Sequence, residues 1–186
     1  MEEEINVSLQ RTRKVREILY RELFGPEKYC FPKIRKEAKE IIELAQPADL
    51  KNLLGKTINE KDISILVYEP HEFRPYWMYV SSGLSDPWFE QPEGEVSGFG
   101  CELVIKSQRP GRWPIKLLRR LAYYILSYSG TLSPGVMLTM DKPIFAAGKS
   151  QLNSILVWYV DEAPDCVYDL PSGKFGLFSV LRLGGE

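Results

Sequence analysis

The residue of this sequence best placed to do chemistry is Glu102, a carboxylate inside an otherwise apolar segment. Residues 98–106 read GFGCELVIK, and their alternation predicts a strand with one face on a core and the other partly solvated. A buried carboxylate needs a partner or a raised pKa, as an acid–base catalyst would have. Glu102 could act with His71, the only histidine, or it could form a structural ion pair. We favour an ion pair with Arg119 or Arg120 of the following helix.

Other catalytic and metal-binding patterns are absent from the sequence. A single histidine excludes the multi-histidine zinc sites, and the three cysteines are widely spaced without a CxxC pair. The segment Gly148-Lys149-Ser150 resembles the end of a phosphate-binding loop, but Pro143 stands where that loop requires its first glycine. No GxSxG or SxxK nucleophile is present. We therefore expect neither a metal nor a cofactor.

Composition and charge narrow the class of partner. The chain of 186 residues carries a formal net charge of −1, so it lacks the basic excess of nucleic-acid and membrane-surface binders. No apolar run is long enough to cross a bilayer, and the acidic N-terminus does not resemble a signal peptide. An odd number of cysteines without such a peptide is typical of reduced thiols, so we expect a cytoplasmic protein.

The hydrophobic periodicity predicts an α+β fold, a single domain with a mixed, mostly antiparallel sheet flanked by helices. Residues 1–60 are predicted to form an N-terminal helical part, with helices over 8–24 and 33–45, and residues 61–186 an α/β core. A third helix begins at Pro114 and ends before Gly130. Strands are predicted at 63–68, 76–80, 99–106, 136–140, 152–160, 166–170 and 175–183. The first two of these should pair as an antiparallel hairpin.

The loop over residues 86–95 is the predicted partner-binding surface. It carries four acidic residues with no basic residue to compensate them, and two aromatic residues of the kinds that are common in binding hot spots. The residues of this acidic aromatic loop assigned to binding are Asp86, Trp88, Phe89, Glu90, Glu93 and Glu95. In the alternative interpretation, the two aromatic side chains fold back over the sheet as a lid. The basic turn at 109–112 is a second candidate surface, although we favour simple solvation there.

Three segments resemble the suppressor-of-fused (Sufu-like) domain family. The stretch 76–86, YWMYVSSGLSD, resembles the family's Y-x-x-V-T/S-x-G-x-S-D segment, and 98–103, GFGCEL, its G-F-x-x-E-L strand. The stretch 113–122, WPIKLLRRLA, resembles its W-P-I-x-L-L-x-x-L-A helix. The resemblance extends over residues 63–183 and implies a mixed α/β domain that acts by binding protein. It assigns a structural role to the motif residues Gly83, Gly98, Glu102, Trp113 and Pro114.

The resemblance also bears on the partner. Animal members of the family hold Gli-type transcription factors by adding a peptide strand of the partner to their sheet. Stand-alone members of this size are mostly bacterial, and many are thought to be immunity proteins that neutralise a cognate toxin. We therefore expect a non-enzymatic protein-binding domain, an immunity protein or antitoxin whose partner is a toxin. Two alternatives stay open: a regulatory module that binds an extended peptide at a sheet edge, and a small hydrolase-like enzyme that uses Glu102 with His71.

Overall fold

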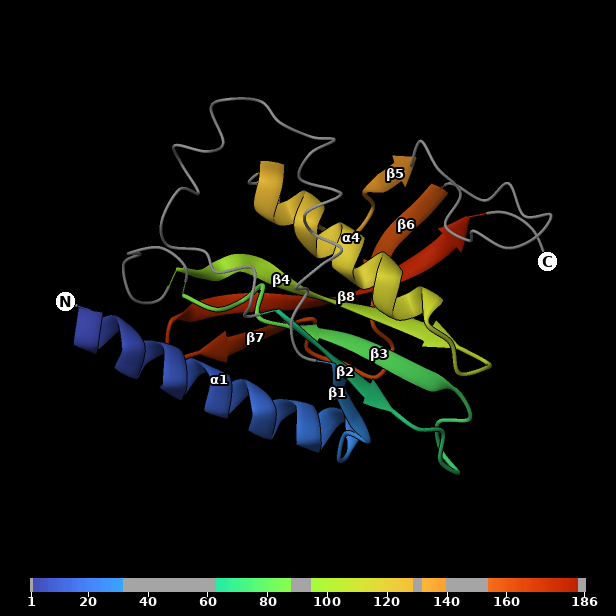
Figure 1. Cartoon of the computed structure of the whole chain (residues 1–186), viewed down its shortest axis with the longest axis horizontal. Helices are drawn as coiled ribbons and strands as arrows, with labels where there is room; N and C mark the ends of the chain where they lie inside the picture. Colours follow the sequence, from blue (N-terminus) through green and yellow to red (C-terminus); the bar gives the residue numbers. More distant parts are fainter. Residues whose placement is uncertain (1, 32–62, 88–94, 129–131, 140–153, 184–186) are drawn as a thin grey trace.

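The computed structural model describes residues 2–31, 63–87, 95–128, 132–139 and 154–183. These residues form two helices and eight strands of one α+β domain (Figure 1). None of the helices in these ranges is long and apolar enough to cross a membrane. The elements, in chain order, are α1 (Glu2–Phe24), β1 (Tyr29–Phe31), β2 (Ser64–Tyr68), β3 (Trp77–Ser82), β4 (Val96–Ser107), α4 (Trp113–Tyr128), β5 (Met137–Thr139), β6 (Ser154–Tyr159), β7 (Val167–Leu170) and β8 (Gly173–Leu183).

The strands form a single mixed sheet in the order β1-β2-β3-β4-β8-β6-β5, and β7 also pairs with β8. The β4–β8 pair at the centre is parallel, whereas every other pair is antiparallel. The predicted hairpin between residues 63–68 and 76–80 is confirmed as β2 and β3. The prediction of a mixed, mostly antiparallel sheet is confirmed as well.

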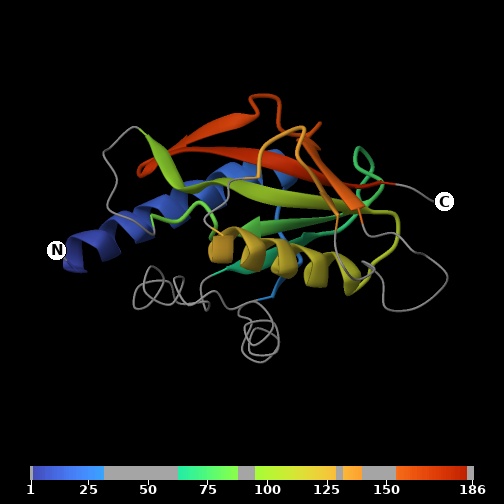
Figure 2. The ribbon, with the colours of Figure 1, turned by 90° about the horizontal axis from the view of Figure 1, so that it is seen from above.

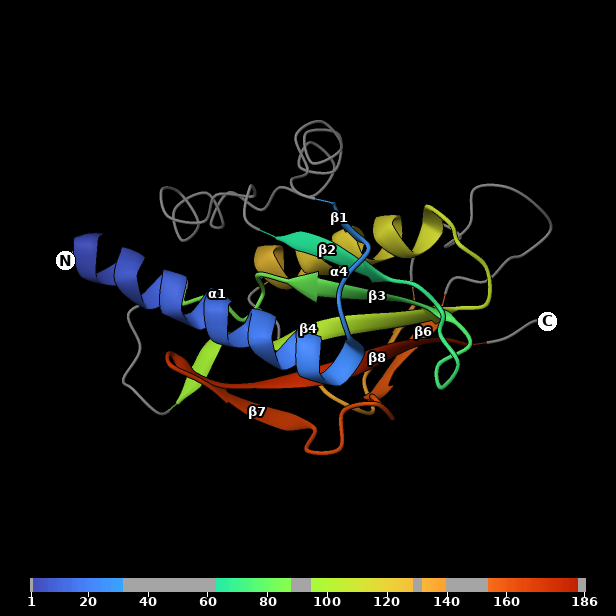
Figure 3. The same cartoon turned by 90° about the horizontal axis from the view of Figure 1, so that it is seen from below.

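The two helices cover opposite faces of the sheet. Figure 1 shows α4 above the strands and α1 below them, and Figure 3 shows α1 in front of the sheet. The core under α4 includes Leu118 and Ile125 of the helix with Cys101 and Leu103 of β4. On the opposite face, a second core gathers side chains from α1, β3, β4, β7 and β8: Tyr20, Phe24, Met78, Val80, Val104, Tyr168, Leu170, Phe175 and Leu177.

The prediction that the second face of β4 is partly solvated holds at Gly100 and Lys106, which are partly exposed, but not between them. Val104 and Glu102 lie on that face, and both are completely buried. The alternation of residues identified the two faces correctly, but it could not show that α1 returns to cover the second one. A strand that is buried on both faces needs apolar side chains on both, which explains why Val104 follows Leu103.

The helix α4 begins one residue before the predicted start. The amide of Lys116 donates to the carbonyl of Arg112, 3.1 Å away, so Trp113 and Pro114 lie in the first turn. Proline fits this position because a first-turn N–H has no partner within the helix. The buried side chains Leu118 and Ile125 then recur along one side of the helix. Figure 2 shows α4 running alongside β3 and β4.

The first helix ends at the predicted residue, Phe24, but its start and the strand that follows it differ from the prediction. α1 begins at Glu2, well before residue 8, and ends where Gly25 adopts a left-handed conformation (φ +80°). The strand β1 follows and pairs with β2, although no strand was predicted there. All three side chains of β1 are exposed, so the sequence carries no alternation that could indicate a strand. The helix predicted at 33–45 lies outside the described residues.

A bulge in β4 lets the preceding loop lie against the strand. The register with β8 shifts between Val96 and Cys101, and Gly98 in this stretch has φ +57°. A Cβ atom at Gly98 would lie 2.2 Å from the carbonyl oxygen of Asp86 and 2.5 Å from that of Leu84. Glycine is required here because the backbone of the loop occupies the space that any side chain would need.

We predict that Gly98→Ala lowers the free energy of unfolding by about 2–4 kcal/mol, because it adds a backbone clash to a left-handed conformation. Gly25→Ala is the matched control: its φ is +80° and nothing lies within 4 Å of the added Cβ, so it should cost only about 1 kcal/mol. Urea unfolding of both variants measures the difference. Equal losses would show that the close approach at Gly98 does not exist in solution.

Candidate functional site

Glu102 is completely buried, and four hydrogen bonds hold its carboxylate. Oε1 accepts from the amides of Gly83 (2.8 Å) and Ser85 (2.9 Å) and from the hydroxyl of Ser85 (2.8 Å). Oε2 accepts from the hydroxyl of Ser81 at 2.5 Å. The loop after β3 therefore wraps around this carboxylate, and the positive φ of Gly83 (+137°) belongs to that turn. Hydrogen bonds of this number satisfy an ionised carboxylate in an apolar surrounding.

The cation beside Glu102 is Arg16 of α1, which is 2% exposed. Its Nη1 lies 3.5 Å from Oε1 of Glu102, and its Nη2 lies 2.7 Å from Oδ1 of Asp86. The guanidinium also donates to the hydroxyls of Ser85 (2.7 Å) and Ser82 (3.2 Å). Burial acts to lower the pKa of Arg16, but the charges of Glu102 and Asp86 outweigh it, and the pKa is raised above its ordinary value. Arg16 is thus held in its charged form between two buried carboxylates.

Asp86 has a second arginine partner. Nε of Arg13 donates to Oδ2 of Asp86 at 2.8 Å, and Nη2 of Arg13 lies 2.6 Å from the same oxygen. Arg13 and Arg16 are one helical turn apart, so both reach the same loop. We call Arg13, Arg16, Asp86 and Glu102 the buried charge cluster.

Hydroxyl groups extend the buried charge cluster to the turn between β7 and β8. The hydroxyl of Ser97 donates to the carbonyl of Ser85 at 2.7 Å and lies 2.5 Å from the hydroxyl of Ser172. The hydroxyl of Ser172 is also 2.8 Å from that of Thr12. The phenol of Tyr20 donates to the carbonyl of Ser81 at 3.1 Å. These bonds connect α1, β3, β4 and the β7–β8 turn in one polar network.

The structure corrects two expectations about Glu102. Its charged partner is Arg16 rather than Arg119 or Arg120, because Glu102 points to the face covered by α1, whereas α4 packs on the opposite face. The proposed pairing with His71 is also wrong. His71 lies in the turn before β3, where Nε of Arg74 donates to its Nε2 at 3.4 Å. The six residues of β3 separate this turn from the loop around Glu102, a span of roughly 15–20 Å.

The acidic aromatic loop is only partly within the described residues. Asp86 is completely buried and paired with two arginines, so the expectation of an uncompensated acid is wrong at this residue. Glu95 is exposed, and its carbonyl accepts a hydrogen bond from the amide of Lys174. The other four assigned residues, Trp88, Phe89, Glu90 and Glu93, lie outside the described ranges. A binding role for the loop stays a prediction.

Sequence reasoning assigned no role to Arg13 or Arg16. The available signal was the position of Arg16. Arg16, Tyr20 and Phe24 recur every four residues, so all three lie on the buried side of α1. A charged residue in such a stripe indicates a buried acidic partner elsewhere in the chain.

The buried charge cluster is a structural site in its present form. Glu102 and Asp86 are inaccessible, so neither carboxylate can contact a substrate, and Arg16 is held by both. Within the described ranges, no three His, Cys, Asp or Glu side chains gather as they would around a metal ion.

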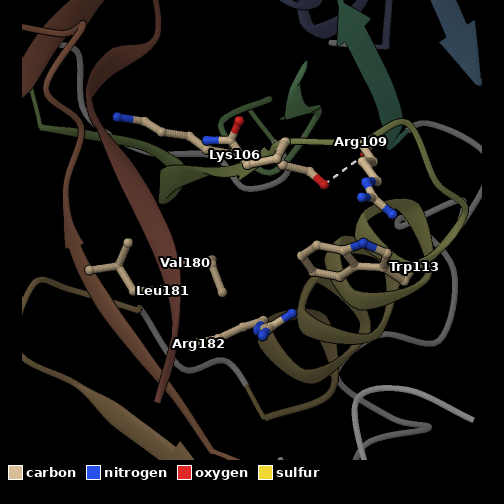
Figure 4. Close-up of a pocket in the computed structure, with 8 residues that line it drawn as sticks. Lys106, Arg109, Trp113, Val180, Leu181 and Arg182 are labelled. Atoms are coloured by element: carbon tan, nitrogen blue, oxygen red, sulfur yellow. Dashed lines mark hydrogen bonds between the residues drawn. The ribbon is translucent and has the colours of Figure 1, made fainter. Parts of the chain in front are cut away.

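Two pockets lie away from the cluster. One, of about 670 Å³, lies between the end of α1 and the β2–β3 turn, and its lining mixes acidic and basic residues such as Glu69, Arg21 and Arg74. The other, of about 440 Å³, lies between β4, β8 and the start of α4 (Figure 4). Its lining residues are Lys106, Ser107, Gln108, Arg109, Trp113, Val180, Leu181 and Arg182.

Comparison with known proteins agrees with the resemblance identified in the sequence. The family model of the suppressor of fused protein (SUFU) matches residues 59–180. The suppressor of fused homologues of Homo sapiens and Mus musculus are each 31% identical in an alignment of 81 residues, and the match covers 37% of this chain. The match spans only 17% of the length of either relative.

Solved structures share the fold at lower identity. Drosophila suppressor of fused superposes with a TM-score of 0.52 at 24% identity, over 72% of this chain and 36% of that one. A chain in the crystal structure of the Sufu–Fu complex superposes with a TM-score of 0.60 at 20% identity, over 94% of this chain and 75% of that one. A SUFU homologue from Neisseria gonorrhoeae superposes with a TM-score of 0.60 at 15% identity, over 93% of this chain and 77% of that one.

We predict that Arg16→Met lowers the free energy of unfolding by about 3–5 kcal/mol, because it leaves two buried carboxylates without their shared cation. Arg11→Met, an exposed change on the same helix, should alter it by less than about 0.5 kcal/mol. Urea unfolding provides both values. The double variant Arg16→Met with Glu102→Gln should lose less than the sum of the single losses, since the two groups interact directly. Additive losses would contradict the contact.

We also predict that the exposed Cys30 and the buried Cys101 differ in reactivity. Burial, with the charge of Glu102 adding to it, raises the pKa of the Cys101 thiol to about 12. At about pH 8, only about one Cys101 thiol in ten thousand is then ionised, and it is inaccessible as well. Cys30 is exposed, so iodoacetamide should modify Cys30 in the folded protein and Cys101 only after unfolding, as peptide mass spectrometry would show. Equal modification rates would contradict the core position of Cys101.

Proposed function

Because this chain belongs to the suppressor of fused protein (SUFU) family, we propose that it is a non-enzymatic protein-binding domain, and more specifically a cytoplasmic immunity protein that neutralises a cognate toxin. The family supports the general statement, since one structure of similar fold is that of the Sufu–Fu complex. The toxin and the location in the cytoplasm are our proposals. Support for them comes from the resemblance to stand-alone family members and from the charge and cysteine content of the sequence.

One observation supports a binding role over a catalytic one: the buried charged groups pair with each other instead of facing a substrate. Glu102, Asp86 and Arg16 would be the reactive candidates in an enzyme, yet they join α1 to the sheet and are inaccessible. What the described residues offer to a partner is outer surface. Several large apolar side chains are exposed there, including Phe73 (88%) and Met137 (64%). Exposed apolar side chains of this kind favour association with another protein.

Neutralisation would occur by occlusion of the toxin rather than by chemistry. A toxin that acts on nucleic acid or on a membrane surface carries a basic face, and acidic side chains on the inhibitor would be complementary to it. Glu95 is exposed and could contribute, together with the predicted contacts of Trp88, Phe89, Glu90 and Glu93. Asp86 would support this surface indirectly, because its arginine pairs hold the start of the loop.

A second candidate function is the binding of an extended peptide at a sheet edge. β1 and β5 are the outermost strands of the sheet, and neither has a second neighbour among the described strands. Edge strands present main-chain N–H and C=O groups that an added strand can pair with. Both strands are only three residues long, and the exposed Tyr29 and Phe31 of β1 would limit which peptides fit.

Co-expression with the product of the neighbouring gene tests the proposal. The expected result is that this product arrests growth alone, that the chain restores growth, and that the purified pair forms a complex. Trp88→Ala with Glu90→Lys should abolish the rescue, because it removes an apolar anchor and reverses a charge of the loop. Ile18→Ala with Glu22→Lys is the matched control, since both residues are exposed on α1 and belong neither to the loop nor to a sheet edge.

Two outcomes would overturn parts of the proposal. A neighbouring product without toxicity, or toxicity that the chain does not relieve, would remove the immunity role. Full affinity of the Trp88→Ala, Glu90→Lys variant would exclude the loop and would favour the sheet edges.

A further inference from the structure

The pocket at the end of β4 exists because the two central strands diverge. The paired register of β4 and β8 ends at Val104 and Ser179, although the strands continue to Ser107 and Leu183. The first turn of α4 closes the wedge on one side, where Trp113 lies across from Val180 and Arg182 (Figure 4). The result is a pocket of about 440 Å³, which is within the usual range for a ligand site.

Among the described residues that line this pocket, the charged side chains are all cationic, in a protein whose net charge is −1. They are Lys106, Arg109 and Arg182. Lys106 contacts Asp161 and Glu162 at 2.8 Å each, so part of its charge is already compensated. Arg109 is exposed at the rim, and the guanidinium of Arg182 lies over the ring of Trp113, 5.8 Å from its centroid. The first turn of α4 contains no acidic residue, so its positive end adds to the same potential.

The uncharged part of the described lining combines the polar Ser107 and Gln108 with apolar residues. Trp113 and Val180 lie toward the core under α4, and Leu181 is exposed on the other side of the wedge. Leu181 pairs with Leu156 of β6 in the register, and Trp158, two residues further along β6, is also exposed. A ligand in this pocket would therefore meet cations and an apolar surface side by side.

We propose that this pocket binds an acidic peptide segment of a protein partner, with carboxylates on Arg109 and Arg182 and an apolar side chain against Trp113. The proposal rests on the protein-binding function and names a contact surface for it. A carboxylate matches the fork of an arginine, and an apolar residue beside it packs against the indole of Trp113. A nucleic acid is a poorer match, because three cations in a protein of pI 6.0 provide little binding to a polyanion.

Titration with short labelled peptides tests this inference. The probe is a hexapeptide of alternating leucine and glutamate, and the comparison peptide has lysine in place of glutamate. We expect the acidic peptide to shift the indole N–H resonance of Trp113, assigned with Trp113→Phe, while the basic peptide leaves it unchanged. Arg109→Glu with Arg182→Glu should weaken the acidic peptide about tenfold or more, as expected when two charge contacts become repulsive.

The matched control is Arg11→Glu with Lys14→Glu, which reverses two exposed cations of α1. It should leave the affinity within about twofold, and thermal unfolding of both double variants confirms that they are folded. The inference is overturned if the Trp113 resonance does not move at about 1 mM acidic peptide, or if both double variants bind equally well. It is also overturned if inorganic phosphate or a single-stranded oligonucleotide displaces the peptide and moves Trp113 in the same way, since the site would then bind free anions or nucleic acid.

The growth and peptide experiments distinguish a failure of the immunity role from a failure of the pocket as a contact surface. If the peptide binds at Trp113 but the chain does not relieve toxicity, the pocket stands and the immunity role is wrong. If toxicity is relieved equally by the wild type and by the Arg109→Glu, Arg182→Glu variant and no peptide binds, the immunity role stands and the pocket is not the contact surface.

Discussion

The fold depends on one buried cation, Arg16, which lies between the carboxylates of Asp86 and Glu102. Removing three charges from water is costly, and only complete pairing with added hydrogen bonds offsets the cost. The loop after β3 supplies those bonds through backbone amides and serine hydroxyls. α1 can therefore dock on the sheet in only one position, because any shift along the helix axis would leave a charge unpaired.

Local patterns predicted most of the elements, and contacts distant in sequence were not predictable. The apolar stripe of α4 and the alternation in β2 and β3 are properties of neighbouring residues, so periodicity was sufficient. The exposed strand β1 has no such pattern. Of the site, the sequence indicated that Glu102 is buried with a cation. It could not indicate that the cation is Arg16, 86 residues earlier (102 − 16), since only the folded backbone brings them together. Loops usually lie on the surface, which is why Asp86 was misplaced.

The buried polar network and the exposed candidate binding surfaces consist of different residues, which suggests how members of the family come to differ in binding. Three solved structures superpose with TM-scores of 0.52 to 0.60 at identities of 15% to 24%, so the fold persists while most residues change. Arg16, Asp86 and Glu102 are buried and offer no group to a partner. Differences in binding then have to arise on loops, sheet edges and the pocket between β4 and β8, where substitutions do not disturb the buried charges.

The parallel pairing of β4 with β8 has a consequence for the order of folding. Glu102 and Leu177 are register partners separated by 75 positions (177 − 102), so the centre of the sheet closes only after the segment between them has been made. During synthesis, β4 would carry an open apolar edge until its last neighbour emerges from the ribosome. The final strand thus completes the sheet, and the nascent chain is most exposed to misassociation or chaperone capture just before that strand is made.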